Sequence, residues 1–161
     1  MLDCGTDALG EFGAGNGFFT GEYLHSLDPK RRLTIPSDWR VIVGEPQRFY
    51  VLPAVESPCL SLYRVPDFLV KLKRLQEHSI VDSKARQMAR IIGARSAFIG
   101  WDSVGRVRIK EGLLESAGLS GRVKLVGALD RIELWNPERW EEVGALEDDS
   151  SLEEAVRYVK L

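Results

Sequence analysis

The 161-residue chain has few of the residues from which catalytic and metal sites are usually built. It contains two cysteines, Cys4 and Cys59, and two histidines, His25 and His78. The cysteines are 55 positions apart, a separation typical of neither a metal site nor a disulfide framework. Neither histidine has an acidic residue or a cysteine at the spacing of a nucleophilic or metal-binding pair. We therefore expect a non-enzyme with no cofactor, no metal and no small-molecule substrate.

Long apolar runs are missing as well. No stretch approaches the roughly 18 apolar residues that a membrane span needs, and residues 1–17 lack the basic and apolar regions of a secretory signal. The mean hydropathy of −0.15 and the hydrophobic content of 44% are ordinary for a soluble protein. The sequence predicts a cytoplasmic protein without membrane contact, in which residues 1–18 form a disordered extension.

A net positive charge is also absent, since the formal net charge is −2. The charges are unevenly distributed, however. Residues 64–110 carry eleven basic and four acidic side chains, whereas residues 1–20 and 111–161 are acidic, at −3 and −6. A basic middle segment permits a nucleic-acid partner, but charge runs on helices are usually solvated faces, so this asymmetry alone is a weak indication.

The most informative feature is an internal repeat with a shift of 74 positions. Residues 23–35 then fall on residues 97–109, with Asp28 on Asp102 and Arg32 on Arg106. At the same shift the apolar run 49–53 falls on 123–127, and a two-residue adjustment places 60–63 on 132–135. The segments match in the same order along the chain, which indicates two copies of one supersecondary unit.

Each copy is expected to contain strand, loop, strand, short helix, strand, turn, strand and helix. Alternating apolar residues predict the strands, and Pro36 ends one of them because it cannot donate to a ladder. Ser37 is the expected cap of a short helix over residues 37–42, and Gly93 is the expected end of a helix over residues 82–92. In the first copy we expect strands at 23–27, 33–35, 49–52 and 60–63, with a further helix at 66–78. A terminal amphipathic helix is expected at 151–161.

A charged Asp-x-x-x-Arg loop occurs at the same place in both copies. We call residues 28–32 the first charged loop and residues 102–106 the second charged loop. The simplest interpretation is structural, with each Asp capping the turn and each Arg solvated or paired with that Asp. The alternative is a binding surface, because arginine side chains bind phosphates and guanine edges, and a narrow β-ribbon fits the major groove of DNA. Recurrence in a repeat favours the second interpretation without excluding the first.

The residues around the loops resemble a known family. The segment Phe19-Thr-Gly-Glu-Tyr-x-His-x-Leu-Asp-x-Lys-x-Arg-Leu-Thr-Ile-Pro36 is similar to the opening of the MraZ family of bacterial transcriptional regulators. The second copy, Asp102-x-x-Gly-Arg-Val-x-Ile109 followed by Ile132-Glu-Leu-Trp-x-x-Glu-Arg-Trp140, resembles the second half of that family. The resemblance covers about residues 18–143.

The resemblance implies an α+β, β-rich fold of two tandem swapped-hairpin barrel modules of the SpoVT/AbrB type. It places these modules at residues 19–68 and 94–140, with a helical connection at 69–93 and an acidic helix or tail at 141–161. It also implies ring-like homo-oligomers, a nucleoid-associated location, and binding to repeated boxes in double-stranded DNA, with repression of the protein's own division and cell-wall operon.

The DNA-contacting residues that the family pattern and the surrounding charges indicate lie in and beside the two loops. The family usually has Lys-Gly-Arg in each loop, whereas this chain has Arg31 in place of the first glycine and Val104 in place of the second lysine. We therefore expect the two loops to contribute unequally to DNA affinity. The candidate DNA-binding residues are Asp28, Lys30, Arg31, Arg32, Asp102, Arg106 and Arg108.

One other function stays open at this stage. Folds of the AbrB type also occur in antitoxins, which bind a partner protein through an extended tail. The acidic segment 138–161 could serve as such a tail, although an antitoxin usually has one copy of the fold and a longer tail.

Overall fold

The computed structural model describes residues 17–54, 57–146 and 149–161. Within these residues it is a mixed α+β protein with eight strands, all in antiparallel ladders, and six helices. Residues 1–16 of the expected disordered extension at 1–18, and with them Cys4, lie outside the described residues. Among the described residues, no helix is both long and apolar enough to cross a bilayer.

Six strands form one antiparallel sheet in the order β1-β7-β8-β4-β3-β5, and β2 and β6 form a separate two-stranded ladder. Alternation of buried and exposed residues explains strands such as β7, where buried Val123 and Leu125 alternate with more exposed neighbours, whereas the central strand β4 is buried at nearly every position. The strands are β1 Glu22–Ser26, β2 Arg32–Thr34, β3 Arg48–Pro53, β4 Cys59–Arg64, β5 Ala97–Gly100, β6 Arg106–Arg108, β7 Arg122–Gly127 and β8 Arg131–Trp135.

The strand pairing exchanges partners between the two halves of the chain. Strand β1 forms its ladder with β7, and β5, its equivalent 74 positions later, forms its ladder with β3. The registers agree: Ser26 lies opposite Arg122, and the shift turns this pair into Gly100 opposite Arg48. In the β2·β6 ladder, Leu33 lies opposite its own equivalent, Val107. The repeat in the sequence is therefore a local twofold arrangement in space.

The core lies where the two halves meet. Leu33 and Val107, the central pair of the β2·β6 ladder, are fully buried, as are Ile35 and Ile109 just after these strands. Each such side chain contributes roughly 1.5–3 kcal/mol when it leaves water. The other fully enclosed apolar side chains come mainly from the large sheet and include Phe19, Phe49, Val51, Leu60, Leu62, Val123, Leu125, Ile132 and Leu134.

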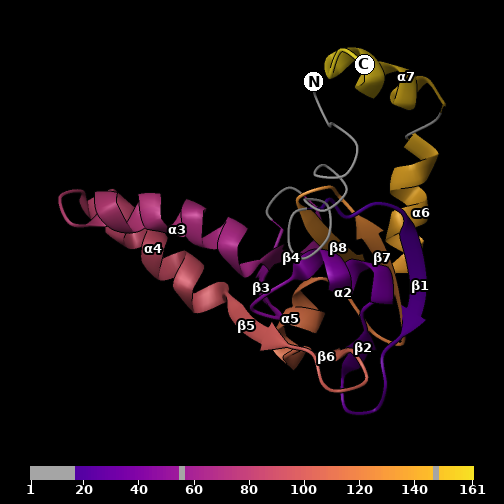
Figure 1. The fold of residues 1–161 in the computed structure, drawn as a ribbon, viewed down its shortest axis with the longest axis horizontal. Coiled ribbons are helices and arrows are strands. Elements are labelled where there is room, and N and C mark those ends of the chain that lie inside the picture. The colour runs from indigo at the N-terminus through magenta and orange to yellow at the C-terminus, as the bar shows by residue number, and fades with distance from the viewer. Residues whose placement is uncertain (1–16, 55–56, 147–148) are drawn as a thin grey trace, which may run out of the picture.

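The helices surround this core and extend beyond it (Figure 1). Helices α3 and α4 lie side by side and form an arm that projects away from the sheet, and α6 and α7 follow the last strand towards the C-terminus. The helices are α2 Ser37–Val43, α3 Val65–Ser79, α4 Ser83–Arg95, α5 Glu111–Ser116, α6 Pro137–Leu146 and α7 Asp149–Tyr158.

Two of the expected helix ends were wrong. Ser37 is the first residue of α2 and not its cap; Pro36, with φ −51° and ψ 138°, occupies the cap position, and no side-chain capping bond is formed. Helix α4 continues through Gly93 to Arg95 and is capped by Ser96. A glycine inside a helix costs only about 1 kcal/mol relative to alanine, which the rest of the helix can offset.

Candidate nucleic-acid interface

The aspartate organises the first charged loop. Asp28 Oδ1 accepts hydrogen bonds from the backbone N–H of Lys30 at 2.9 Å and of Arg32 at 2.8 Å. Asp28 Oδ2 accepts a third bond, from Arg32 Nε at 2.5 Å. The turn is closed by backbone bonds between Arg32 and Asp28 and between Arg31 and Asp28. One carboxylate thus fixes both the turn and the arginine that follows it.

The second charged loop repeats this geometry. Asp102 Oδ1 accepts from the backbone N–H of Val104 and of Arg106, each at 3.0 Å, and Asp102 Oδ2 accepts from Arg106 Nε at 2.9 Å. The structural interpretation of the motif is therefore correct as far as it goes, since each Asp caps its turn and pairs with its Arg. Both arginine side chains remain partly exposed, at 26% for Arg32 and 31% for Arg106, so their outer nitrogens can reach a ligand.

These contacts lower the pKa of both carboxyl groups. For Asp102 the largest cause is the hydrogen bond from the Arg106 backbone, and burial opposes it only in part. For Asp28 partial burial works to raise the pKa, but the hydrogen bonds from Arg32 and Lys30 together outweigh it. Both aspartates are consequently ionised at neutral pH, and the Asp–Arg pairs are charge-assisted.

The missing glycine of the first loop does not change the loop's conformation. Arg31 adopts φ +60°, in the left-handed region, and its equivalent Gly105 adopts φ +87°. The carbonyl of each residue accepts a bond from the opposite half, Arg31 O from Ile109 N at 3.0 Å and Gly105 O from Ile35 N at 2.9 Å. Arg31 therefore takes the glycine-like conformation, at a steric cost that glycine would not have. Val104, the other departure from the family pattern, has an exposed side chain.

The two charged loops lie side by side at one end of the molecule, beside the β2·β6 ladder (Figure 1). Because Leu33 and Val107 point into the core, the side chains that alternate with them are more exposed. Arg32 lies directly opposite Arg108, and Thr34 lies directly opposite Arg106. Like charges directly opposite each other destabilise a ladder. We call Arg32, Thr34, Arg106 and Arg108 the arginine face.

The structure brings most of the candidate residues together around the β2·β6 ladder, namely Asp28, Arg32, Asp102, Arg106 and Arg108. The exposed residues Lys30 and Arg31 lie in the first loop beside this ladder. Sequence reasoning missed three cations close to them. Arg48 and Arg122 begin β3 and β7, are equivalent at the 74-residue shift, and immediately precede the matched apolar runs 49–53 and 123–127. Arg40 of α2 lies against Gly105: a Cβ built on this glycine would stand 2.6 Å from Arg40 Cζ.

Other parts of the molecule offer less chemistry. His25 Nδ1 lies 3.0 Å from the carbonyl of Thr34, so this histidine ties β1 to β2 as a packing residue would. Cys59 is buried as expected, and burial and Glu133 raise the pKa of its thiol to about 12. In the described parts of the chain, His, Cys, Asp and Glu side chains form no group of three or more that could hold a metal ion.

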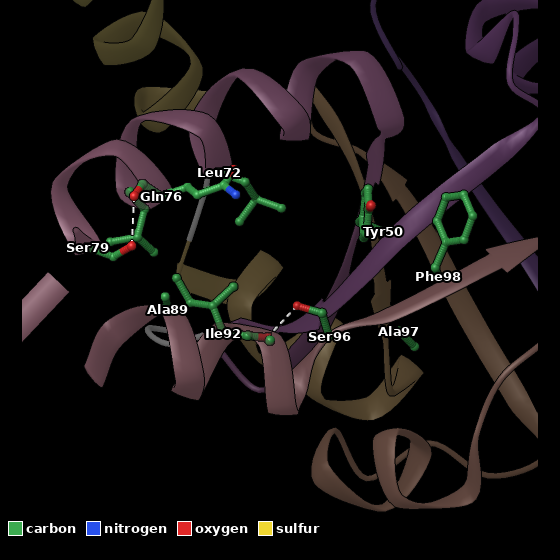
Figure 2. Close-up of a pocket in the computed structure, with 11 residues that line it drawn as sticks. Tyr50, Leu72, Gln76, Ser79, Ala89, Ile92, Ser96, Ala97 and Phe98 are labelled. Atoms are coloured by element: carbon green, nitrogen blue, oxygen red, sulfur yellow. Dashed lines mark hydrogen bonds between the residues drawn. The ribbon is translucent and has the colours of Figure 1, made fainter. Parts of the chain in front are cut away.

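A groove of about 380 Å³ lies where the α3–α4 arm meets β5 (Figure 2). Leu72, Ile92 and Phe98 give it a largely apolar wall, and Gln76 and Ser79 contribute polar atoms. No carboxylate, histidine or cysteine is among its lining residues in the described part of the chain. Its wall therefore supplies no acid–base pair.

Together the fold and the loops define a class: a strand-rich α+β protein with a duplicated, twofold-related charged loop. The family model described as "MraZ protein, putative antitoxin-like" matches residues 94–160. A protein of Dictyoglomus thermophilum named transcriptional regulator MraZ is 39% identical over 124 residues, which are 77% of this chain and 83% of the relative. Proteins of the same name from Finegoldia magna and Alkaliphilus metalliredigens are 32% and 33% identical over 134 residues, 83% of this chain and 90% of each relative. The chain belongs to the MraZ family.

Proposed function

We propose that this protein is a transcriptional regulator that binds specific DNA sequences through its two charged loops. The observation that carries the proposal is the matched geometry of the loops, which places two pre-organised arginines on one ladder beside several further cations. The names of the relatives, all transcriptional regulators, support it.

In this proposal the arginine face approaches the major groove, because a two-stranded ribbon is narrow enough to enter it. Arg32 and Arg106 make the principal contacts, with their orientation set by Asp28 and Asp102. Lys30, Arg31 and Arg108 add contacts to phosphates. The first loop offers more charge and the second carries glycine at its left-handed position, so the two contribute unequally.

We propose further that residues 19–68 and 94–140 are two swapped-hairpin modules of the SpoVT/AbrB type, connected by residues 69–93 and followed by the acidic segment 141–161. The exchange of β1 and β5 between the halves supports this division, since each half completes the ladder of the other. Neither half would keep all of its strand pairing alone.

The quaternary arrangement that fits this proposal is a ring-like homo-oligomer that engages several repeated boxes at once. Two loops per chain make few contacts with DNA. When several chains share one ring, binding of the first loops raises the effective concentration of the remaining loops near the neighbouring DNA boxes. We place the protein at the nucleoid in the cytoplasm, as a repressor of its own division and cell-wall operon.

The proposal is tested by a gel shift on repeat-containing DNA from just upstream of the gene. The double variant Arg32→Ala/Arg106→Ala should lose binding while its size on a gel-filtration column stays unchanged. The matched control is Arg86→Ala/Arg90→Ala, which removes the same charge from exposed positions on α4 and should bind like the unmodified protein. Sequence-specific binding by the loop variant would refute the assignment of the loops.

A second candidate function is protein binding, as in an antitoxin, which the description of the matching family model favours. The acidic C-terminal segment has exposed apolar residues in and after α7, among them Leu152, Tyr158 and Leu161, which a partner protein could cover. Purification of the full chain from its host would test this: a stoichiometric small basic protein that dissociates on deletion of residues 149–161 would support the antitoxin role.

A further inference from the structure

The local twofold arrangement places one arginine from the opposite half of the chain beside each charged loop. Arg48, at the start of β3, lies opposite Gly100, two residues before Asp102. Arg122, at the start of β7, lies opposite Ser26, two residues before Asp28. Both arginines are exposed. Each loop is therefore flanked by a cation at the same position.

The side chain of Arg48 lies along β5, the strand that leads into the second loop. A Cβ built on Gly100 would stand 3.3 Å from Arg48 Cγ and 3.7 Å from Arg48 Nε, so the arginine stem lies across this glycine. Arg48 Cζ is also 5.0 Å from the centre of the Phe98 ring, a cation–π contact. The backbone of Gly100 and the ring of Phe98 thus hold the Arg48 side chain against β5.

Arg48 shares a hollow of about 450 Å³ with the arginine face. The hollow is lined by Arg32, Arg48, Arg106 and Arg108, together with Gly100, Trp101 and Asp102. Its one carboxylate, Asp102, is already engaged by Arg106. Around the hollow, cations outnumber acids four to one, and Arg32 faces Arg108 across the ladder. Such a concentration of like charge is unfavourable without an anion and becomes favourable when one lies between the guanidinium groups.

Three of the arginines beside the loops form no ion pair with another described residue and can therefore bind an external anion. Arg32 and Arg106 pair with the loop aspartates, whereas Arg48, Arg108 and Arg122 have no carboxylate within 4.0 Å in the described part of the chain. This contrasts with Arg131 and Lys124, which lie in the same large sheet and do form ion pairs. These three arginines are therefore free of ion pairs among the described residues, as are the control residues Arg86 and Arg90 on α4.

We propose that Arg48 and Arg122 bind backbone phosphates on the two strands of a DNA duplex, one on each side of the groove that the charged loops enter. The two strands of a duplex are themselves related by local twofold axes, so a twofold-related pair of arginines presents an equivalent contact to each strand. In the Arg48 site, Arg108 joins the phosphate contact; at the equivalent position of the Arg122 site the chain has Thr34. This inference rests on the proposed DNA-binding function and adds to it the residues that position the protein on the backbone.

Phosphate contacts and base contacts leave different traces in binding data. A phosphate contact adds affinity for any sequence, whereas a base contact adds preference for one sequence. Each phosphate that a cation neutralises steepens the slope of log K against log salt concentration by about 0.9. The two arginines should therefore affect the salt slope and leave the ratio of affinities for specific and scrambled DNA unchanged.

The test is a fluorescence-anisotropy titration of the full-length protein at several salt concentrations, with a duplex from upstream of the gene and a scrambled duplex. Arg48→Gln and Arg122→Gln should each reduce the salt slope by about 0.9, and the double variant by about 1.8. Affinity for both duplexes should fall by the same factor. Arg48→Lys/Arg122→Lys, which keeps both charges, should restore most of the slope, and Arg86→Gln/Arg90→Gln controls for the change in net charge.

Three outcomes are distinguishable. A salt slope unchanged relative to the α4 control, in a protein that still prefers the upstream duplex, would overturn this inference and leave the proposed function intact. A change in the preference ratio alone would mean that the two arginines read bases, which also overturns it. If the unmodified protein shows no preference for the upstream duplex, the proposed function itself fails. Thermal unfolding of each variant verifies that it is folded, and the single glutamine variants keep the test possible if the double variant is not folded.

Discussion

The left-handed conformation of Arg31 leads to a quantitative prediction. Arg31 has φ +60° where the second charged loop has Gly105 at φ +87°. A left-handed conformation costs a non-glycine residue roughly 1–2 kcal/mol, and glycine loses about 0.5–1 kcal/mol more in chain entropy on folding. The difference predicts that Arg31→Gly raises the free energy of unfolding by roughly 0.5–1 kcal/mol. For a chain of this length that raises Tm by about 1–4 °C.

Urea denaturation followed by circular dichroism measures this change, with Arg31→Ala as the matched control. Both variants remove the same charge, but alanine keeps the steric cost of the left-handed conformation and glycine does not. Both should therefore weaken DNA binding to a similar degree, and only Arg31→Gly should gain stability. If Arg31→Gly is no more stable than Arg31→Ala, the backbone of the first loop does not carry the cost assigned to it.

Three further predictions concern other residues. The pKa values of Asp28 and Asp102 are lowered in the folded protein, so the stability that these carboxylates contribute is present at neutral pH and is lost as the pH falls below their ordinary pKa of 3.8. NMR titration should give midpoints below 3.8 for both groups. A midpoint at or above 3.8 would contradict the loop geometry. Cys59, buried and with a pKa of about 12, should resist iodoacetamide at pH 8 in a Cys4→Ser variant until urea unfolds the protein, whereas equal rates before and after unfolding would show an accessible thiol. Gly127→Ala should lower the free energy of unfolding by about 1–3 kcal/mol, because its Cβ would stand 2.6 Å from backbone atoms of Phe19 and Thr20; urea denaturation with no loss of stability would refute this contact.

The local features of the fold were predictable from the sequence because they depend on local patterns. Alternation of apolar residues located the short strands, and the repeat placed the same Asp-x-x-x-Arg spacing at residues 28–32 and 102–106, where the two loops have one geometry. The Asp-x-x-x-Arg spacing contains the chemistry that closes each turn, since the carboxylate reaches two backbone N–H groups within four residues. Such contacts need no information from the rest of the chain.

The pairing of strands was less accessible. Nothing local in residues 22–26 indicates that β1 pairs with β7 and not with β2, the strand that follows it. That choice depends on burial of both halves in one core. Arg48 and Arg122 were missed for the same reason, because they join the loops only through the exchanged ladders. Their alignment at the 74-residue shift is the signal that could have revealed them.

The central claim is that the protein recognises a specific DNA sequence. The most direct test is the ratio of its dissociation constants for the duplex from upstream of its own gene and for a scrambled duplex of equal length, measured at 0.15 M salt. Specific complexes are typically 10³-fold or more tighter than nonspecific ones, and we expect a ratio on the order of 10³ that falls to about 1 in the Arg32→Ala/Arg106→Ala variant. Equal affinity of the unmodified protein for both duplexes would contradict the account.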